Sequence, residues 1–150
     1  MKKFQFKYEK ILQLRYDKED EIRNKLGNLN KKIIDEEERL KDLIRSQEAF
    51  LESVSQEMEK GTTVGAMKSI EHNKSYLKNS IDKSKKTLKL LFDERVKIQK
   101  ALIEANKERK VMEKLKEKEI ENYKAMEQIE ENKLVDQIVT YQSTRKRGDS

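Results

Sequence analysis

A short glycine-containing segment, Gly61-Thr62-Thr63-Val64-Gly65, interrupts a chain that otherwise has the sequence of long helices. The chain has no proline, and no other place in its first 147 residues has two glycines close together. Glycine readily leaves the helical region of backbone space and often ends a helix, and Thr62 or Thr63 can cap a following helix. We therefore predict a hinge at residues 61–65 that folds one long helix back on another. A continuous helix is the alternative, at a cost of about 1 kcal/mol per glycine.

The composition leaves few other kinds of fold. Charged residues make up 43% of the 150 residues and hydrophobic residues 34%, whereas ordinary globular domains have about 25% charged residues. A disordered chain and an extended helical coil remain, and the sustained helical periodicity of the apolar residues favours the coil. The chain has no cysteine, so disulfides and cysteine-based metal sites are excluded.

The distribution of charged and apolar residues bears on location and partners. No apolar run approaches the roughly 18 residues of a membrane span, so we expect no direct membrane insertion. No apolar core of a signal peptide follows Met1-Lys2-Lys3, so we expect a cytoplasmic protein. The net charge is +6, but acids and bases are interleaved, which is typical of a solvated helix surface. Binding of nucleic acid through basic residues 78–100 is disfavoured, because no aromatic platform or known motif accompanies them.

Apolar residues recur at alternating steps of three and four on both sides of the hinge, which is the contact line of a coiled coil. Before the hinge, the line consists of Ile22, Leu26, Leu29, Ile33, Glu36, Leu40, Leu43, Gln47, Phe50 and Val54. After the hinge, it consists of Met67, Ile70, Lys74, Leu77, Ile81, Ser84, Leu88, Leu91, Arg95, Ile98, Leu102, Ala105, Arg109 and Met112. We therefore predict an all-α fold, a long antiparallel two-helix coiled coil in a single domain. Helix one is expected at about 6–60, helix two at about 66–141, and a disordered tail at 142–150.

A short hinge makes the two helices antiparallel neighbours and sets their register. Residue i then lies opposite residue 126 − i, so Leu29 lies near Ile98 and Leu40 approaches Leu88. Charge supports this pairing, because residues 35–60 have nine acids and four bases, a net charge of −5. Residues 78–100, on the facing helix, have eight bases and three acids, a net charge of +5. Complementary flanks of this kind select partner and orientation.

The same register leaves helix two longer than helix one. Residue 4 lies opposite about residue 122, so about 20 residues of helix two have no partner within the chain. Apolar residues continue through this overhang at Tyr123, Met126, Ile129, Leu134, Ile138 and Tyr141. A helix with an uncovered apolar face is suited to binding another protein. Fraying or self-association of the overhang is the alternative.

The titratable residues indicate structural roles. His72, the only histidine, lies on a charged helix near the hinge and is expected at the surface. Pairs of carboxylates are common, but two packed helices cannot desolvate them enough to shift their pKa values for acid–base catalysis. We therefore predict no enzymatic activity, no metal and no cofactor. Arg15 and Glu19 fall on the contact line opposite residues 108–112, where an ion cluster would set the register.

Three sequence features occur in order along the chain. The first is Phe4-x-Phe6-x-Tyr8-x-x-Ile11-Leu12-x-Leu14-Arg15 followed by an acid-rich helix, and the second is the hinge at Gly61. The third is Glu108-Arg109-Lys110-Val111-Met112-Glu113-Lys114-Leu115-Lys116, then Tyr123-Lys124 and Asn132-Lys133-Leu134-Val135-Asp136-Gln137-Ile138. Together they resemble the family of the flagellar export protein FliJ over essentially the whole chain. That family has a Leu-x-Asp-Glu-like element, from which Gln137 after Asp136 departs.

The resemblance implies an antiparallel coiled coil similar to the gamma-subunit stalk of rotary ATPases. It implies binding to the hexameric ATPase of flagellar type III protein export through the end with both termini. It also implies contact with a transmembrane export gate protein through the hinge end, and interaction with export chaperones. The expected function is thus a non-enzymatic coupling stalk at the flagellar base, on the inner face of the cell membrane, with a role in motility and chemotaxis. A chaperone or escort that holds export substrates or recycles export chaperones is the alternative.

Carried onto matching positions, the resemblance gives two sets of candidate binding residues. The candidates for binding the ATPase are Arg15, Arg109, Lys110, Leu115, Tyr123, Met126 and Leu134. The candidates for binding the export gate are Leu43, Gln47, Phe50, Tyr76 and Leu77. For each of them, an ordinary position on the contact line or on the surface is the alternative.

Overall fold

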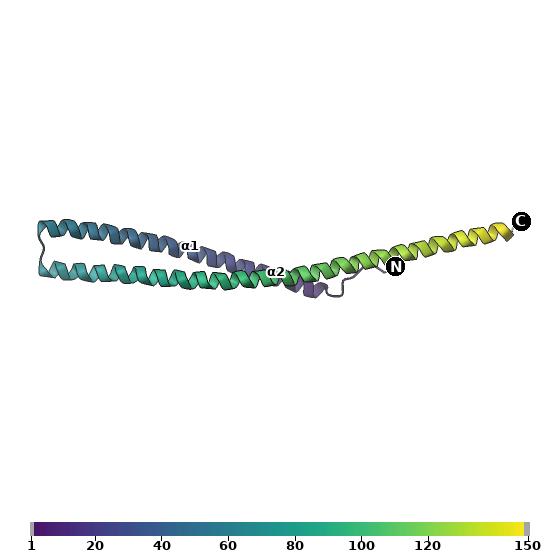
Figure 1. Ribbon diagram of the computed structural model, residues 1–150, viewed down its shortest axis with the longest axis horizontal. Coiled ribbons are helices and arrows are strands. Elements are labelled where there is room, and N and C mark those ends of the chain that lie inside the picture. The colour runs from purple at the N-terminus through teal and green to yellow at the C-terminus, as the bar shows by residue number, and fades with distance from the viewer. Residues whose placement is uncertain (1, 149–150) are drawn as a thin grey trace. The chain divides into compact units, whose positions relative to one another are not determined.

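The computed structural model describes residues 2–148 and consists of two long α-helices (Figure 1). Helix α1 spans Glu9–Lys60, and helix α2 spans Val64–Gly148. The two helices pack against each other as an antiparallel hairpin, and the described part of the chain contains no strand. The predicted all-α helical hairpin is therefore confirmed.

The hinge consists of the residues between the helices, 61–63. Gly61 has φ = 89°, in the left-handed region that favours glycine, and its N–H lies 3.3 Å from the carbonyl oxygen of Met58. Thr63 caps α2, because its Oγ1 accepts a 3.1 Å hydrogen bond from the N–H of Ala66. The predicted hinge is thus confirmed but is shorter than expected. Gly65 lies in the first turn of α2, which begins at Val64 rather than near residue 66.

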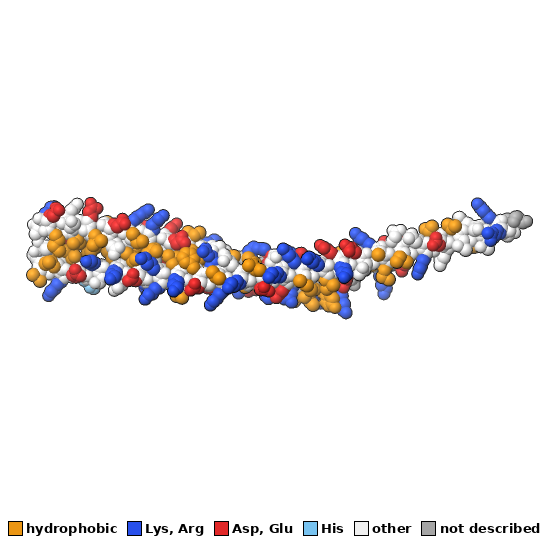
Figure 2. All heavy atoms as spheres, in the orientation of Figure 1, with side chains coloured by type: hydrophobic (Ala, Val, Ile, Leu, Met, Phe, Trp, Pro, Cys, Tyr) orange, Lys and Arg blue, Asp and Glu red, His pale blue; other side chains and the backbone are white. Residues whose placement is uncertain are grey.

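The chain divides into two compact units, each built from parts of both helices. We call Asp20–Ile103 the hinge unit, and Met1–Glu19 with Glu104–Ser150 the terminal unit. In the hinge unit, hydrophobic side chains gather along the line where α1 and α2 face each other (Figure 2). Its core contains Leu29, Ile33 and Leu88, with Leu40, Leu91 and Ile98 packed against them, as the predicted register requires. Our description of the whole chain as one domain stays a prediction.

The predicted contact line agrees closely with burial in the hinge unit. Every position of its first half, from Ile22 to Val54, is buried or half-buried. The polar member Glu36 accepts a 2.7 Å hydrogen bond from Oγ of the buried Ser84. The line is less well covered just after the hinge, where Met67 and Lys74 are exposed. The polar pair of Glu36 and Ser84 therefore replaces an apolar contact without interrupting the contact line.

Two helix ends differ from the prediction. Helix α1 begins at Glu9 rather than near residue 6, because the residues before it are not helical. Helix α2 continues through Gly148, so the predicted disorder was wrong for residues 142–148, and the last two residues lie outside the described ones. No proline or glycine interrupts residues 142–147. The cations of the last turn also interact favourably with the helix macrodipole, and they are Arg145, Lys146 and Arg147.

Candidate functional site

A non-helical N-terminal segment, residues 2–8, packs on α2 in the terminal unit. The Phe6 side chain is buried, and the Phe4 ring lies 5.5 Å from the Tyr123 ring between centroids. The Tyr123 hydroxyl also donates a hydrogen bond to the backbone carbonyl of Lys2. Tyr123 is therefore half-buried, and our prediction that it lies in the uncovered overhang was wrong. No local sequence pattern connects this segment with its partner Tyr123.

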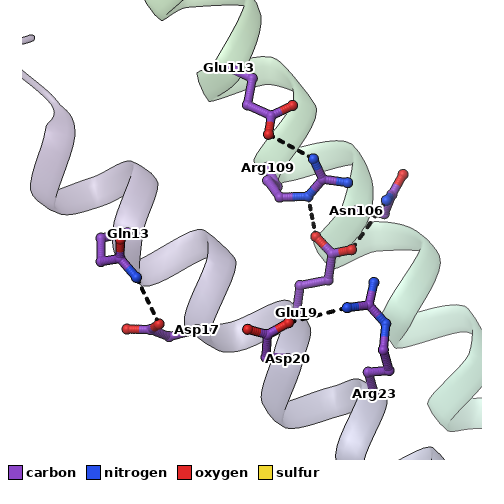
Figure 3. A network of polar contacts seen from close by, with 8 residues as sticks. All are labelled: Gln13, Asp17, Glu19, Asp20, Arg23, Asn106, Arg109 and Glu113. Carbon is purple, nitrogen blue, oxygen red and sulfur yellow. Dashed lines mark hydrogen bonds and ion pairs between the residues drawn. The ribbon is translucent and has the colours of Figure 1, made fainter.

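A charged network centred on Glu19 joins α1 to α2 in the terminal unit (Figure 3). The Glu19 residue is only 3% exposed, and its carboxylate accepts hydrogen bonds from Nε of Arg109 and, at 3.3 Å, from Nδ2 of Asn106. Nη1 of Arg109 also donates to Oε1 of Glu113 at 2.8 Å. The predicted ion cluster is therefore present. These hydrogen bonds form only where Glu19 faces Arg109 and Asn106, so the network favours one register of the two helices.

Half-exposed contacts flank this network. Nη1 of Arg15 lies 2.8 Å from Oε2 of Glu108, and the hydroxyl of Tyr16 donates to Oε1 of Glu113. The Arg109 guanidinium lies 5.6 Å from the centroid of the Tyr16 ring, within the range of a cation–π interaction. Exposed ion pairs contribute at most about 1 kcal/mol each. These contacts therefore add little stability, and their main effect is to select which residues of α1 and α2 face each other.

Three pKa values in the network are shifted by these hydrogen bonds, and the bonds to Glu19 and Glu113 raise the pKa of Arg109. The hydrogen bond from Tyr16 holds the pKa of the Glu113 carboxyl below its ordinary value, and the hydrogen bond from Arg109 acts in the same direction. The same contact with Glu113 raises the pKa of the Tyr16 hydroxyl. The network is therefore adapted to an ionised Glu113 and a neutral Tyr16.

Acid is expected to weaken the terminal unit through Glu113. A carboxyl whose pKa is lower in the folded state stabilises that state above its ordinary pKa of 4.5, and this contribution is lost as the pH falls through the folded-state value. Glu113→Gln should therefore lower the melting temperature near pH 7 and flatten its fall between neutral and acidic pH, measured by circular dichroism. The exposed Glu121→Gln serves as the control. The same pH dependence in wild type and both variants would contradict this role of Glu113.

Beyond residue 127, α2 is uncovered. Every residue from 128 to 148 is exposed, whereas Tyr123 and Glu127 are half-buried. A groove of about 430 Å³ lies on this face and is lined by Tyr123, Glu127, Glu130, Glu131 and Leu134. Seven apolar residues on this part of α2 are exposed, with exposed fractions from 49% for Ile138 to 67% for Tyr141. They are Met126, Ile129, Leu134, Val135, Ile138, Val139 and Tyr141. We call residues 126–145 of α2, in which Glu127 alone is half-buried, the uncovered segment.

The candidates for binding the ATPase fall into two groups. Arg15, Arg109 and Tyr123 take part in the contacts described above, and Leu115 is half-buried. The remaining candidates have exposed side chains, and they are Lys110, Met126 and Leu134. The candidates of the first group are therefore engaged in packing or polar contacts within the chain rather than gathered in one place. The binding role of all seven stays a prediction.

The candidates for binding the export gate belong to the hinge unit. Four of them are half-buried positions of the contact line between α1 and α2, and they are Leu43, Gln47, Phe50 and Leu77. Tyr76, by contrast, is 66% exposed. Only Tyr76 of this set therefore projects mainly into solvent. The binding role of these residues also stays a prediction.

The described residues, 2–148, contain no group of three or more His, Cys, Asp or Glu residues placed to hold a metal ion. Neither helix, over the same residues, contains an apolar stretch of the length that a bilayer crossing requires.

The glycine hinge, the contact line and the charged network define a helical-hairpin protein of the coiled-coil class. A protein-family model described as "Flagellar FliJ protein" matches residues 4–148, nearly the whole chain. The chain therefore belongs to the FliJ family, whose members are components of the flagellar export apparatus. The matched range includes residues 4–8 of the N-terminal segment and all of the uncovered segment. Among curated protein sequences and among solved structures, no match was found.

Proposed function

We propose that this chain is a non-enzymatic stalk that binds the hexameric export ATPase and couples it to the transmembrane export gate. It would act at the flagellar base, on the inner face of the cell membrane. The uncovered segment carries this proposal, because its apolar residues repeat along a helix that continues past the N-terminal segment. Exposed apolar surface of this kind marks an interaction site. A single helix is about 10–12 Å across, which suits insertion into the pore of a ring.

Positive charge near the uncovered segment supports an acidic partner surface. Lys110 and Lys114 are exposed on α2, whereas Arg109 is engaged with Glu19. We therefore assign the attraction toward the ATPase to these two lysines rather than to Arg109. Exposed charges are screened at a Debye length of about 8 Å at physiological ionic strength, so added salt should weaken this binding.

The proposed contact with the export gate lies in the hinge unit. Tyr76 is the strongest of the five candidates, because its ring is exposed while the other four side chains help to hold α1 against α2. An exposed tyrosine offers both apolar area and a hydroxyl for hydrogen bonding, which makes tyrosine common at interfaces.

The proposal is tested by mixing the chain with the export ATPase of the same organism. A stalk should raise the rate of ATP hydrolysis and the fraction of ATPase in hexameric rings, measured by phosphate release and by electron microscopy. No change in either quantity would refute the proposed stalk.

A role as chaperone or escort is the second candidate, because the same uncovered segment could hold an unassembled substrate. Binding of unassembled filament proteins or of their chaperones, together with unchanged ATP hydrolysis, would favour the escort. The two outcomes are measured on the same purified chain, so they separate the candidates directly.

A further inference from the structure

The uncovered segment has an ordered distribution of charge along one face. Its contact line continues from Tyr123 in steps of four and three through Glu127, Glu131, Leu134, Ile138, Tyr141 and Arg145. The beginning of this line is acidic, its middle is apolar, and its end is basic. A 3-4 spacing is the pattern of a helix that packs on another helix, and within residues 2–148 no second helix covers this line beyond residue 127.

We propose that two copies of this chain pair through their uncovered segments, antiparallel, when no other partner covers them. Placing Glu127 opposite Arg145 of the second copy also places Glu131 opposite Tyr141 and Leu134 opposite Ile138. Each of these pairs occurs twice, as a twofold interface requires. Parallel pairing would instead place acid opposite acid and base opposite base, which is unfavourable.

Both polar pairs of the proposed interface repeat chemistry that the terminal unit already uses between α1 and α2. A glutamate facing an arginine on the contact line repeats Glu19 and Arg109. A glutamate facing a tyrosine hydroxyl repeats Glu113 and Tyr16. The apolar centre of the pairing would cover Leu134, Ile138 and Tyr141, which are 58%, 49% and 67% exposed. The uncovered segment of a second copy therefore matches this segment both in charge and in the spacing of apolar residues.

The proposed interface is short, and this limits its stability. Residues 127–145 span about 27 Å at a rise of 1.5 Å per residue. One helix face of this length buries less surface than a standard interface of about 1,600 Å². The pairing is therefore weak and reversible, so a partner with higher affinity would displace it. This inference concerns the free chain and does not rest on the proposed function.

Two charge-reversed variants of the full chain test the pairing. The basic variant carries Glu127→Lys and Glu131→Lys, and the acidic variant carries Arg145→Glu and Lys146→Glu. Wild type should dimerise reversibly with rising concentration in sedimentation velocity. In a dimer of either variant, residues 127 and 145 of the two copies carry charges of the same sign. The dissociation constant of each variant should therefore rise about tenfold or more, equivalent to about 1.4 kcal/mol. An equimolar mixture should restore pairing to within a few-fold of wild type, because each basic end then meets an acidic one.

Cysteine cross-linking tests the orientation, since the chain has no cysteine of its own. Glu130→Cys mixed with Thr144→Cys should form a disulfide-linked dimer, whereas neither variant alone should do so. Circular dichroism melts of all variants establish that the hairpin remains folded. A wild-type chain that stays monomeric from micromolar to millimolar concentration would overturn the proposal. So would dimerisation that ignores the charge reversals, or cross-linking of either cysteine variant with itself. Because only the purified chain is used, each of these failures leaves the proposed ATPase contact standing.

Discussion

Replacing Ile33 with aspartate is expected to lower the melting temperature of the hinge unit sharply, whereas the same change at Ile34 leaves it nearly unchanged. Ile33 is 2% exposed and lies in the core with Leu29 and Leu88, while Ile34 is 55% exposed. An unpaired carboxylate in an apolar core costs several kcal/mol, of order 3 or more, in the free energy of unfolding. A substitution on the surface usually changes it by less than about 0.5 kcal/mol.

The two variants form a matched pair, because they introduce the same residue at neighbouring positions of one helix. Thermal and urea unfolding followed by circular dichroism give the free energies. A loss of about 3 kcal/mol corresponds to a fall of about 6–12 °C in the melting temperature of a chain of this size. Equal destabilisation by both variants would mean that the contact line does not run through Ile33.

Removing residues 128–150 is expected to abolish most of the stimulation of the export ATPase while the melting temperature of the remaining hairpin stays nearly unchanged. The boundary follows the structure, because Glu127 is the last half-buried residue of α2. A cut before Tyr123 would also remove its contact with Phe4 and would confuse folding with binding. ATP hydrolysis is measured with equal amounts of full and truncated chain. Full stimulation by the truncated chain would move the ATPase contact to the hinge unit, with Tyr76 as its first candidate.

Point substitutions in the full chain control for the loss of length. Leu134→Asp places a charge on the apolar contact line of the uncovered segment. Asn132→Asp introduces the same carboxylate about 200° away around the helix, at 100° per residue. We expect the first change, and not the second, to reduce ATPase stimulation. Neither change should alter the melting temperature, since both positions are exposed.

The main features of the fold could be predicted because they depend on local backbone chemistry and on the spacing of apolar residues along the sequence. The positive φ of Gly61 needs glycine, and the steps of three and four need only the order of apolar residues. The Glu19–Arg109 pair also followed from register, since both residues fall on the contact line. The helical end at residues 142–148 did not follow, because the loss of an apolar pattern removes a reason to pack without ending a helix.

The candidate site was harder to predict, because a side chain that contacts other residues of the same chain is less available to a partner. Arg109 had the charge expected of a residue that binds a partner, but its guanidinium is engaged with Glu19 and Glu113. The packing of Phe4 against Tyr123 joins residues that no local pattern connects. Exposure distinguishes Lys110, Met126 and Leu134 from these internal contacts, and exposure depends on tertiary structure rather than on residue type.

The short connection at Gly61 governs the order in which the two helices meet as the chain folds. Glu36 and Ser84 are 48 residues apart in the sequence, whereas Lys2 and Tyr123 are 121 residues apart. Closing the longer loop directly costs about 0.8 kcal/mol more in chain entropy. Pairing that starts beside the hinge and advances turn by turn closes only a short loop at each step. The N-terminal segment is therefore expected to dock last and to detach first, so it can come away from Tyr123 while Leu29, Ile33 and Leu88 stay packed.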